Sequence, residues 1–258
     1  MPFEYYFFLG SAFILGSVIG SFLNVCIYRI PAGKSIVSPP SSCPQCGHSI
    51  RWFQNIPILS YLFLMGRCAG CGQKISLRYP LIEILTGGLF ALVLYYFGLS
   101  LATPVYSLFA AVLVVITFID LDHQIIPDVI SLPGIVIGFA CSFAIPWVGW
   151  FDSLLGILLG GGLLLAIAWG YQLLAKREGM GGGDMKLLAM IGAFLGWKAI
   201  FPVIFLASLG GTAIGVPLML LRREDTRLAL PFGPFLSFAA IVFLLWGPQI
   251  LNWYLGFF

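Results

Sequence analysis

Residues 5–28 read YYFFLGSAFILGSVIGSFLNVCIY, a run of 24 residues without a charged side chain. A helix that crosses the hydrocarbon core of a membrane needs roughly 17–25 mostly apolar residues, so this run predicts a transmembrane helix. A cleavable signal peptide would begin with basic residues and have a shorter apolar core, whereas the preceding residues contain no Lys or Arg. We therefore interpret the run as a membrane span.

The composition of the whole chain is also typical of a membrane protein. Of its 258 residues, 60% are hydrophobic and only 9% are charged, whereas soluble domains carry about 25% charged residues. The formal net charge of +3 is too small to indicate a nucleic-acid-binding protein. The lipid bilayer is the predicted surrounding, and no nucleic acid is expected as a partner.

Apolar runs along the chain predict an all-α, polytopic protein with about eight transmembrane helices. The run at 84–119 is too long for one span at about 1.5 Å per residue, and residues 98–104 divide it in two. The segment at 187–197 has only 11 uncharged residues, and it is the one ambiguous span. The remaining spans are expected at 129–151, 153–175, 199–221 and 228–258.

The distribution of basic residues favours eight spans. With eight, only Lys198 of the 13 basic residues lies on the outer side, and 12 lie on the inner side. With seven, Arg222, Arg223 and Arg227 change sides and the division becomes 10 to 3. Because cytoplasmic loops are enriched in Lys and Arg, we expect both termini outside and a cytoplasmic loop at 29–78.

Two Cys-x-x-Cys pairs lie in this predicted cytoplasmic loop. Cys43 and Cys46 form one pair, Cys68 and Cys71 form the other, and a glycine that suits a tight turn follows each pair. Four thiolates gathered in this way predict a closed tetrahedral zinc site with no position for a substrate, so its expected role is structural. The alternatives are free thiols or two disulfides, and a reducing cytoplasm disfavours disulfides.

Acidic residues gather where the predicted spans meet the cytoplasm. Asp120 lies at the inner end of the third span, and Asp122 and His123 are expected in the loop that follows it. Asp128 directly precedes the fourth span, where it is alternatively a helix N-cap. A carboxylate at this depth costs free energy, so it indicates a functional site by default.

A further acidic residue follows the glycine-rich run GMGGGD at 179–184. This run is either a flexible loop with a helix cap at Asp184, or a backbone whose Gly181 and Gly183 let a substrate pass close to Asp184. The predicted topology places Asp120 and Asp184 on the same side and at similar depth. Because two carboxylates that share one proton can act on water as base and acid, the pair is a candidate dyad.

Together, these motifs make the chain resemble the type IV prepilin peptidases of pilus and type II secretion systems. This family combines a leader peptidase of the GxGD-type intramembrane aspartyl class with an N-methyltransferase. The resemblance covers essentially the whole chain. It rests on motifs in the family order: GSFLNVCIYRIP at 20–31, the two Cys-x-x-Cys pairs, RYPLIE at 78–83, IDLD at 119–122, IPD at 126–128 and GGGD at 181–184.

The resemblance implies that Asp120 and Asp184 are the catalytic pair of the peptidase. The substrate would be a prepilin or pseudopilin whose basic leader is cut after a glycine, at the cytoplasmic face of the bacterial inner membrane. The remaining motif residues would lie next to the substrate; they are Gly181, Gly183, Asp122 and Asp128.

The resemblance also implies a methyl-transfer half. The new N-terminal residue of the substrate would be methylated with S-adenosylmethionine, and the cytoplasmic loop with its zinc site is associated with this step. Glu83 and Gly66 are the candidate residues. The alternatives are that Glu83 is an interfacial carboxylate paired with Arg78, and that Gly66 is a turn glycine.

The implied division of the chain has three parts. They are a first helix at 1–28, a methyltransferase-associated zinc loop at 29–79 and a seven-helix aspartyl peptidase domain at 80–258. Competing interpretations are a proton-coupled transporter, an assembly subunit with a zinc-organised docking loop, and a peptidase without methyltransferase activity. The sequence sets neither the oligomeric state nor the particular prepilins.

Overall fold

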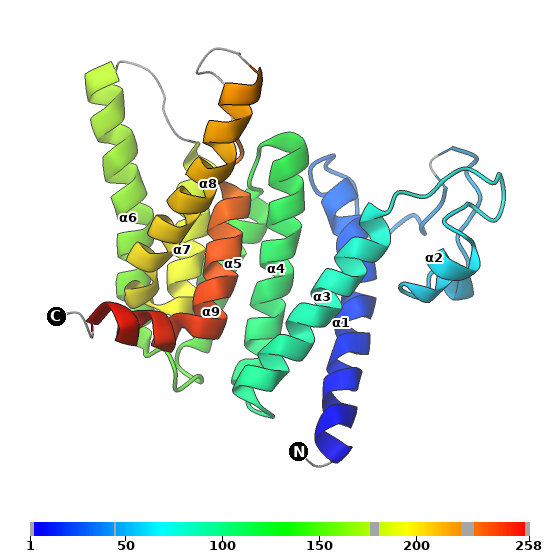
Figure 1. Ribbon diagram of the computed structural model, residues 1–258, viewed down its shortest axis with the longest axis horizontal. Helices are drawn as coiled ribbons and strands as arrows, with labels where there is room; N and C mark the ends of the chain where they lie inside the picture. The colour runs from blue at the N-terminus through cyan, green and yellow to red at the C-terminus, as the bar shows by residue number, and fades with distance from the viewer. Residues whose placement is uncertain (1–2, 44, 176–180, 223–229, 256–258) are drawn as a thin grey trace. The chain divides into compact units, whose positions relative to one another are not determined.

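A computed structural model of the protein describes residues 3–43, 45–175, 181–222 and 230–255. Throughout these residues the secondary structure is helical, and the two β-bridges, Ser42 with Ser49 and Arg67 with Lys74, are isolated. The chain forms two compact units, unit 1 (Met1–Val115) and unit 2 (Ile116–Phe258). Figure 1 shows the helices of each unit. The predicted all-α fold is confirmed.

Eight helices of 14 or more residues in the described part of the chain lie at the eight predicted spans, although α5 ends at Cys141, ten residues before the predicted end at 151. They are α1 (Phe3–Arg29), α3 (Arg78–Phe97), α4 (Ala102–His123), α5 (Asp128–Cys141), α6 (Trp150–Ala175), α7 (Gly182–Leu195), α8 (Ile200–Arg222) and α9 (Gly233–Leu255). Shorter elements are η1 (Trp52–Gln54), α2 (Leu59–Phe63) and η2 (Trp197–Ala199). Six of the described helices are long and apolar enough to cross a membrane, so the chain is a multi-pass membrane protein.

The other two long helices, α5 and α7, have only 14 residues each. At about 1.5 Å per residue each measures about 21 Å, which is less than the ~30 Å hydrocarbon core. In α7, every residue from Leu187 to Leu195 is buried, so this helix is enclosed by protein. The chain therefore tolerates a short α7 because neighbouring helices, and not lipid, surround most of it.

Glycines let the helices of unit 1 approach closely. A Cβ atom at Gly16 would lie 2.8 Å from the Cα of Gly87, and one at Gly20 would lie 2.8 Å from the Cα of Glu83. Small residues four apart are a common means of packing helices in membranes, where lipid is as apolar as the helix surfaces. The Asn24 side-chain amide adds a 3.3 Å hydrogen bond to the Tyr79 carbonyl, so α1 and α3 form a tight pair.

Unit 2 uses the same kind of packing around α7. A Cβ at Gly156 of α6 would overlap the Gly192 carbonyl, and one at Gly160 would lie 2.5 Å from the Leu188 carbonyl oxygen. The Ser153 hydroxyl donates to the Ala193 carbonyl at 2.8 Å. The backbones of α6 and α7 are therefore in direct contact.

Two details at the ends of α4 and α5 differ from the sequence-based expectation. Asp122 and His123 lie on the last turn of α4 and not in a loop. The helix continues to His123. The next residue, Gln124, has a φ of +54°, in the left-handed region that terminates helices. Asp128 is the first residue of α5, and not its N-cap, because Pro127 occupies that position and no side chain caps the helix.

The α6–α7 contact gives a test with a matched control in the same helix. We expect Gly156→Ala to lower stability by about 1–3 kcal/mol, because its methyl group would force two backbones apart. Gly162→Ala should be neutral, since a Cβ there meets no atom within 4 Å. Thermal unfolding in detergent compares the variants, and equal midpoints would contradict the packing described.

Candidate active site and metal centre

Asp120 lies near the end of α4 and is buried, with 5% of its surface exposed. Its Oδ2 atom accepts a 2.9 Å hydrogen bond from the backbone N–H of Gly233, the first residue of α9. A Cβ at position 233 would lie only 2.6 Å from this oxygen. Glycine therefore allows the start of α9 to approach the carboxylate and to hold it by a backbone donor.

Asp184 is the third residue of α7 and is partly buried. Its carboxylate interacts electrostatically with that of Asp120, with like charges opposing each other. The structure thus brings together the two aspartates that the sequence analysis singled out. Two carboxylates that repel each other at partly buried positions hold one shared proton more easily than two negative charges.

Ile126 packs against two glycines beside the aspartates: Gly183, which precedes Asp184, and Gly233, which donates to Asp120. A Cβ at Gly183 would lie 2.9 Å from the Ile126 Cβ, and one at Gly233 would lie 3.3 Å from the Ile126 Cδ1. By contrast, a Cβ at Gly181 or Gly182 would meet no atom within 4 Å. Among the described residues, packing therefore restricts the last glycine of the GGGD motif and not the first two.

Two further acidic residues of the peptidase motifs, Asp122 and Asp128, are exposed. Asp128 forms a two-oxygen ion pair with Lys186 of α7, with Nζ–O distances of 2.7 and 2.8 Å. Exposed pairs of this kind contribute about 0–1 kcal/mol, so the pair helps to seat α7 against α5 without dominating stability. Asp122 is exposed on the last turn of α4.

The four loop cysteines form a compact cluster in unit 1. Their Sγ atoms all lie within 4.8 Å of one another, and the Cys43–Cys71 and Cys46–Cys68 pairs are each 4.0 Å apart. Tetrahedral ligands ~2.3 Å from a central ion would be ~3.8 Å apart, so the cluster fits a four-thiolate metal site. The six described cysteines are free, and these 4.0 Å Sγ–Sγ separations are well beyond the ~2.05 Å of a disulfide bond.

The two halves of the cluster are built alike. In the first, Cys43 N–H bonds the His48 carbonyl and Gly47 N–H bonds the Cys43 carbonyl, both at 2.9 Å. In the second, the equivalent bonds are Cys68 N–H to the Gln73 carbonyl and Gly72 N–H to the Cys68 carbonyl, at 2.8 and 2.9 Å. Each turn closes through a glycine with positive φ, +70° at Gly47 and +72° at Gly72, as expected from sequence.

The thiols of the cluster differ in acidity. Backbone N–H groups, that of Cys46 foremost, lower the pKa of Cys43 to about 6. At Cys71 the backbone N–H of Gln73 lowers the pKa, but the other thiols and burial outweigh it and raise the pKa to about 11. A bound cation would favour the thiolate at every position, so metal binding and proton release are coupled here.

Glu83 lies on α3 and is buried, with 7% of its surface exposed. Its Oε2 accepts a 2.7 Å hydrogen bond from the Ile58 N–H, and the Ser21 side chain of α1 also hydrogen-bonds the carboxylate. Ile58 has a φ of +62°, which is costly for a β-branched residue. Glu83 therefore connects α1, α3 and the loop, so it is not simply an interfacial carboxylate.

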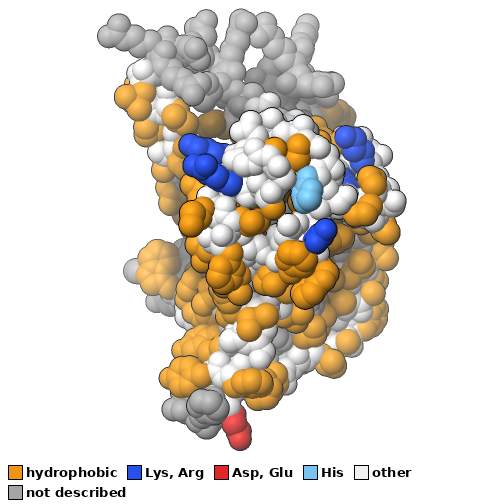
Figure 2. Space-filling model, turned by 90° about the vertical axis from the view of Figure 1, so that its right-hand side faces the viewer, with side chains coloured by type: hydrophobic (Ala, Val, Ile, Leu, Met, Phe, Trp, Pro, Cys, Tyr) orange, Lys and Arg blue, Asp and Glu red, His pale blue; other side chains and the backbone are white. Residues whose placement is uncertain are grey.

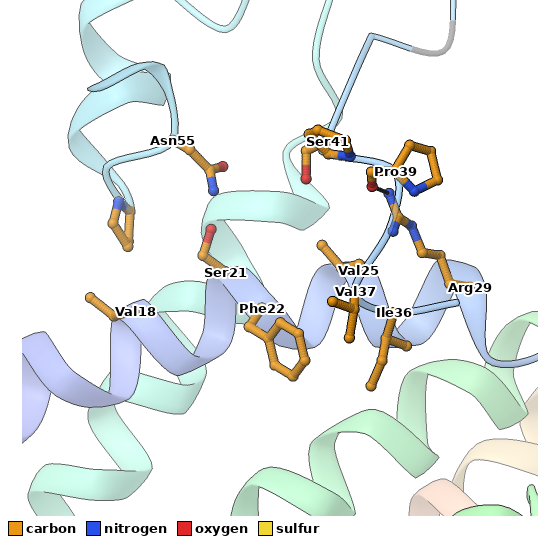
Figure 3. A pocket seen from close by; sticks show the side chains of 12 residues that line it. Val18, Ser21, Phe22, Val25, Arg29, Ile36, Val37, Pro39, Ser41 and Asn55 are labelled. Carbon is orange, nitrogen blue, oxygen red and sulfur yellow. Dashed lines mark hydrogen bonds between the residues drawn. The ribbon is translucent and has the colours of Figure 1, made fainter. Parts of the chain in front are cut away.

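A cavity of about 250 Å³ lies between α1 and the loop of unit 1. Figure 3 shows Ser21 and Asn55 at one end and Arg29 at the other, with apolar side chains such as Phe22 and Val37 between them. The Arg29 guanidinium donates to the Ser35 and Pro39 carbonyls at 3.0 and 2.8 Å, which holds the loop over this end. Since Ser21 also contacts Glu83, the cavity adjoins the buried carboxylate.

Gly66 occupies the turn between α2 and the second cysteine pair, and it is not among the residues that line the cavity. Its φ is +65°, and a Cβ would lie 2.7 Å from the Tyr61 hydroxyl oxygen. Its N–H bonds the Tyr61 carbonyl at 2.9 Å. These features are those of a turn glycine.

Several residues at these sites were not predicted from the sequence. Gly233 and Ile126 complete the surroundings of the aspartates, and Ser21 and Ile58 complete those of Glu83. A signal for Gly233 exists in the stretch LPFGPF at 230–235, where a glycine between two prolines opens an apolar helix. No sequence signal identifies Ile58, because its backbone N–H is the interacting group.

Two family models match the chain. Residues 14–97 match the bacterial peptidase A24 N-terminal domain, and residues 107–216 match the type IV leader peptidase family. Glu83 and the cysteines lie in the first match, and both aspartates lie in the second. No solved structure is a significant match to the chain.

Curated relatives named prepilin leader peptidase/N-methyltransferase align along most of the chain. The relative from Aeromonas hydrophila is 39% identical, over 96% of this chain and 94% of its own. That from Pseudomonas aeruginosa is 37% identical, over 97% and 94%, and that from Myxococcus xanthus is 44% identical, over 83% and 66%. The chain therefore belongs to the type IV leader peptidase family.

The geometry of the cysteine cluster predicts a bound ion. Purified protein should contain about one divalent metal ion per chain, because four thiolates at this spacing form a complete tetrahedral shell. Cys68→Ser should remove most of the metal, whereas Cys141→Ser, outside the cluster, should not. Elemental analysis measures both, and unchanged metal content in the Cys68 variant would contradict the site.

Proposed function

We propose that the protein cleaves the leader peptide of prepilins or pseudopilins and then methylates the new N-terminal residue. The observation that carries this proposal is the approach of Asp120 and Asp184 in unit 2, with Asp120 held by the Gly233 N–H. The chain's similarity to relatives named prepilin leader peptidase/N-methyltransferase supports the choice of substrate and of both activities.

In the proposed cleavage, the two aspartates act on one water molecule. One carboxylate takes a proton from the water as the water oxygen bonds to the carbonyl carbon, and the other gives a proton to the carbonyl oxygen. The first carboxyl group then passes its proton to the amide nitrogen as the C–N bond breaks, and the second recovers its proton as the carbonyl re-forms. The Gly233 N–H fixes the orientation of Asp120 for this exchange. An extended substrate segment would pass beside Asp184 at Gly181 and Gly182, where an added Cβ meets no atom of the described residues within 4 Å.

We place the peptidase site at the cytoplasmic face of the bacterial inner membrane. The inner and outer distribution of basic residues supports this orientation. Four of those residues, Lys176, Arg177, Arg223 and Arg227, lie outside the described part of the chain. A prepilin is cut between a basic leader and an apolar helix, and this junction lies at the same boundary.

For methyl transfer, we propose unit 1, at the end of the cavity where Ser21 contacts Glu83. S-adenosylmethionine would supply the methyl group, and zinc would be the structural ion of the cysteine cluster. Gly66 would act by shaping the turn that precedes Cys68. The functional division at 1–28, 29–79 and 80–258 stays a prediction. Its boundaries differ from that between the two compact units, which lies after Val115.

The dyad is tested by substitutions that keep the shape of the side chain. Asp120→Asn and Asp184→Asn should each lower the cleavage rate by about a thousandfold or more, and the double variant should be no worse, because the pair acts as a unit. Asp128→Asn should retain most of its activity, since its carboxylate pairs with Lys186 at the surface. The assay is prepilin processing, with membrane insertion checked in parallel.

Two outcomes would refute this assignment. If Asp184→Asn cleaves normally, the dyad is wrong. If Asp120→Asn cleaves normally while Asp128→Asn or Asp122→Asn is inactive, Asp184 has a different partner.

Glu83 tests the separation of the two activities. We expect Glu83→Gln to reduce methylation at least about tenfold, which corresponds to about 1.4 kcal/mol, while cleavage changes little. The amide keeps an acceptor for the Ile58 N–H but removes the negative charge beside the cavity. Mass spectrometry of a prepilin incubated with S-adenosylmethionine reports both steps, and equal losses in a folded variant would contradict the division.

The orientation is tested at the two ends of α8. In a cysteine-free background, Lys198→Cys should react with an impermeant reagent from outside, and Arg222→Cys should react from the cytoplasm. In a seven-span chain, position 198 would face the cytoplasm and position 222 would face the outside. Labelling of Arg222→Cys only from outside would therefore refute the eight-span topology.

A further inference from the structure

The loop of unit 1, which was predicted to lie in the cytoplasm, contains a long uncharged stretch. Residues 52–65 read WFQNIPILSYLFLM, with Arg51 directly before them and Arg67 two residues after them. An apolar stretch of 10–14 residues is too short to span a bilayer, and it is typical of buried core helices and of re-entrant or interfacial segments. The structure distinguishes between these possibilities.

The side chains of this stretch are not buried in a core. Trp52, Phe63 and Met65 are 81%, 82% and 86% exposed, and Leu59 and Leu62 are also exposed. Contiguous exposed apolar surface of this kind marks an interaction site. Figure 2, which shows the right-hand face of Figure 1, has hydrophobic side chains gathered below the Lys and Arg side chains.

The contacts of the stretch place it level with the membrane-spanning part of α1. Asn55 and Pro57 line the same cavity as Val18 and Ser21, and the Ile58 N–H bonds Glu83. Arg29 marks the basic end of α1, and Ser21 lies ~12 Å before it along the helix, at about 1.5 Å per residue. Figure 1 accordingly draws α2 below the level at which α1 ends.

The backbone of the stretch is also suited to an apolar surrounding. In lipid every backbone N–H needs a partner within the protein, since no water is present to replace it. The Ile58 N–H uses the Glu83 carboxylate, and the Ile56 N–H uses the Ser60 hydroxyl at 2.9 Å. The N–H groups of Asn55 and Ser60 bond backbone carbonyls at 3.2 and 3.0 Å.

We infer that residues 52–65 form a re-entrant element whose exposed apolar side chains contact the lipid of the bilayer. The shared cavity with Val18 and Ser21 of α1, together with the depth of the stretch and its backbone hydrogen bonds, selects lipid as the partner. Arg51 and Arg67 lie at the two ends of the element, where their charged groups can reach the headgroups.

This placement brings the cavity of Figure 3 to membrane depth. Its volume of about 250 Å³ is below the ~300–1,000 Å³ of pockets that enclose drug-sized ligands. A chain terminus or side chain that is itself embedded in the bilayer could therefore enter the cavity from the side, without first moving into water.

Photo-crosslinking in reconstituted bilayers of phosphatidylcholine and phosphatidylglycerol tests the inference. The photoreactive residue benzoyl-phenylalanine would replace Phe63, Ile14 or Ser49 in separate samples of the full chain. Ile14 is an exposed residue of α1 and serves as the lipid-facing control, and Ser49 is an exposed loop residue near the cysteine cluster and serves as the aqueous control. Metal content and membrane insertion verify that each variant is folded.

We expect the lipid adduct at position 63 to match the yield at position 14 within about twofold and to exceed that at position 49 by at least about fivefold. A yield at position 63 equal to that at position 49 would overturn the inference, since the element would then face water. Crosslinks from position 63 to another part of the protein, in place of lipid, would overturn it as well.

Discussion

A carboxylate inside a membrane protein needs hydrogen-bond donors from the protein itself, because the surrounding lipid offers none. Both buried carboxylates described above meet this need with a backbone N–H. Asp120 uses that of Gly233, and Glu83 uses that of Ile58. In each case the donating backbone must come very close to the carboxylate. The first donor is accordingly a glycine, Gly233, and the second, Ile58, adopts an unfavourable φ.

The same demand for close backbone approach recurs in the helix packing. α1 meets α3 at Gly16 and Gly20, and α6 meets α7 at Gly156 and Gly160. Because lipid is as apolar as the helix surfaces, burying apolar area does not favour one helix neighbour over lipid. Close van der Waals contact between helices does. One of these tightly paired helices, α7, carries Asp184 in its first turn.

The sequence predicted those features that depend on local composition. The eight helices follow from uncharged runs, and the cysteine cluster follows from paired ligands two residues apart, whose turns close through Gly47 and Gly72 as expected. Features that depend on distant backbone groups were not predictable. Asp120 and Gly233 are 113 positions apart, and nothing in the chain between them encodes that one N–H reaches that oxygen. The alternative interpretation of Asp128 as an N-cap is wrong, because Pro127 occupies that position and the Asp128 carboxylate pairs with Lys186.

The cysteine pairs bracket the uncharged stretch at 52–65, with Cys46 before it and Cys68 after it. A single ion bound to both pairs would close this part of the chain into a ring. Closing a loop in advance removes entropy that the open chain would otherwise lose on ordering. Part of the free energy of metal binding would then be available to hold Ile58 in its unfavourable backbone conformation against Glu83. An ion that touches only sulfur would in this way help to fix a carboxylate on a different helix.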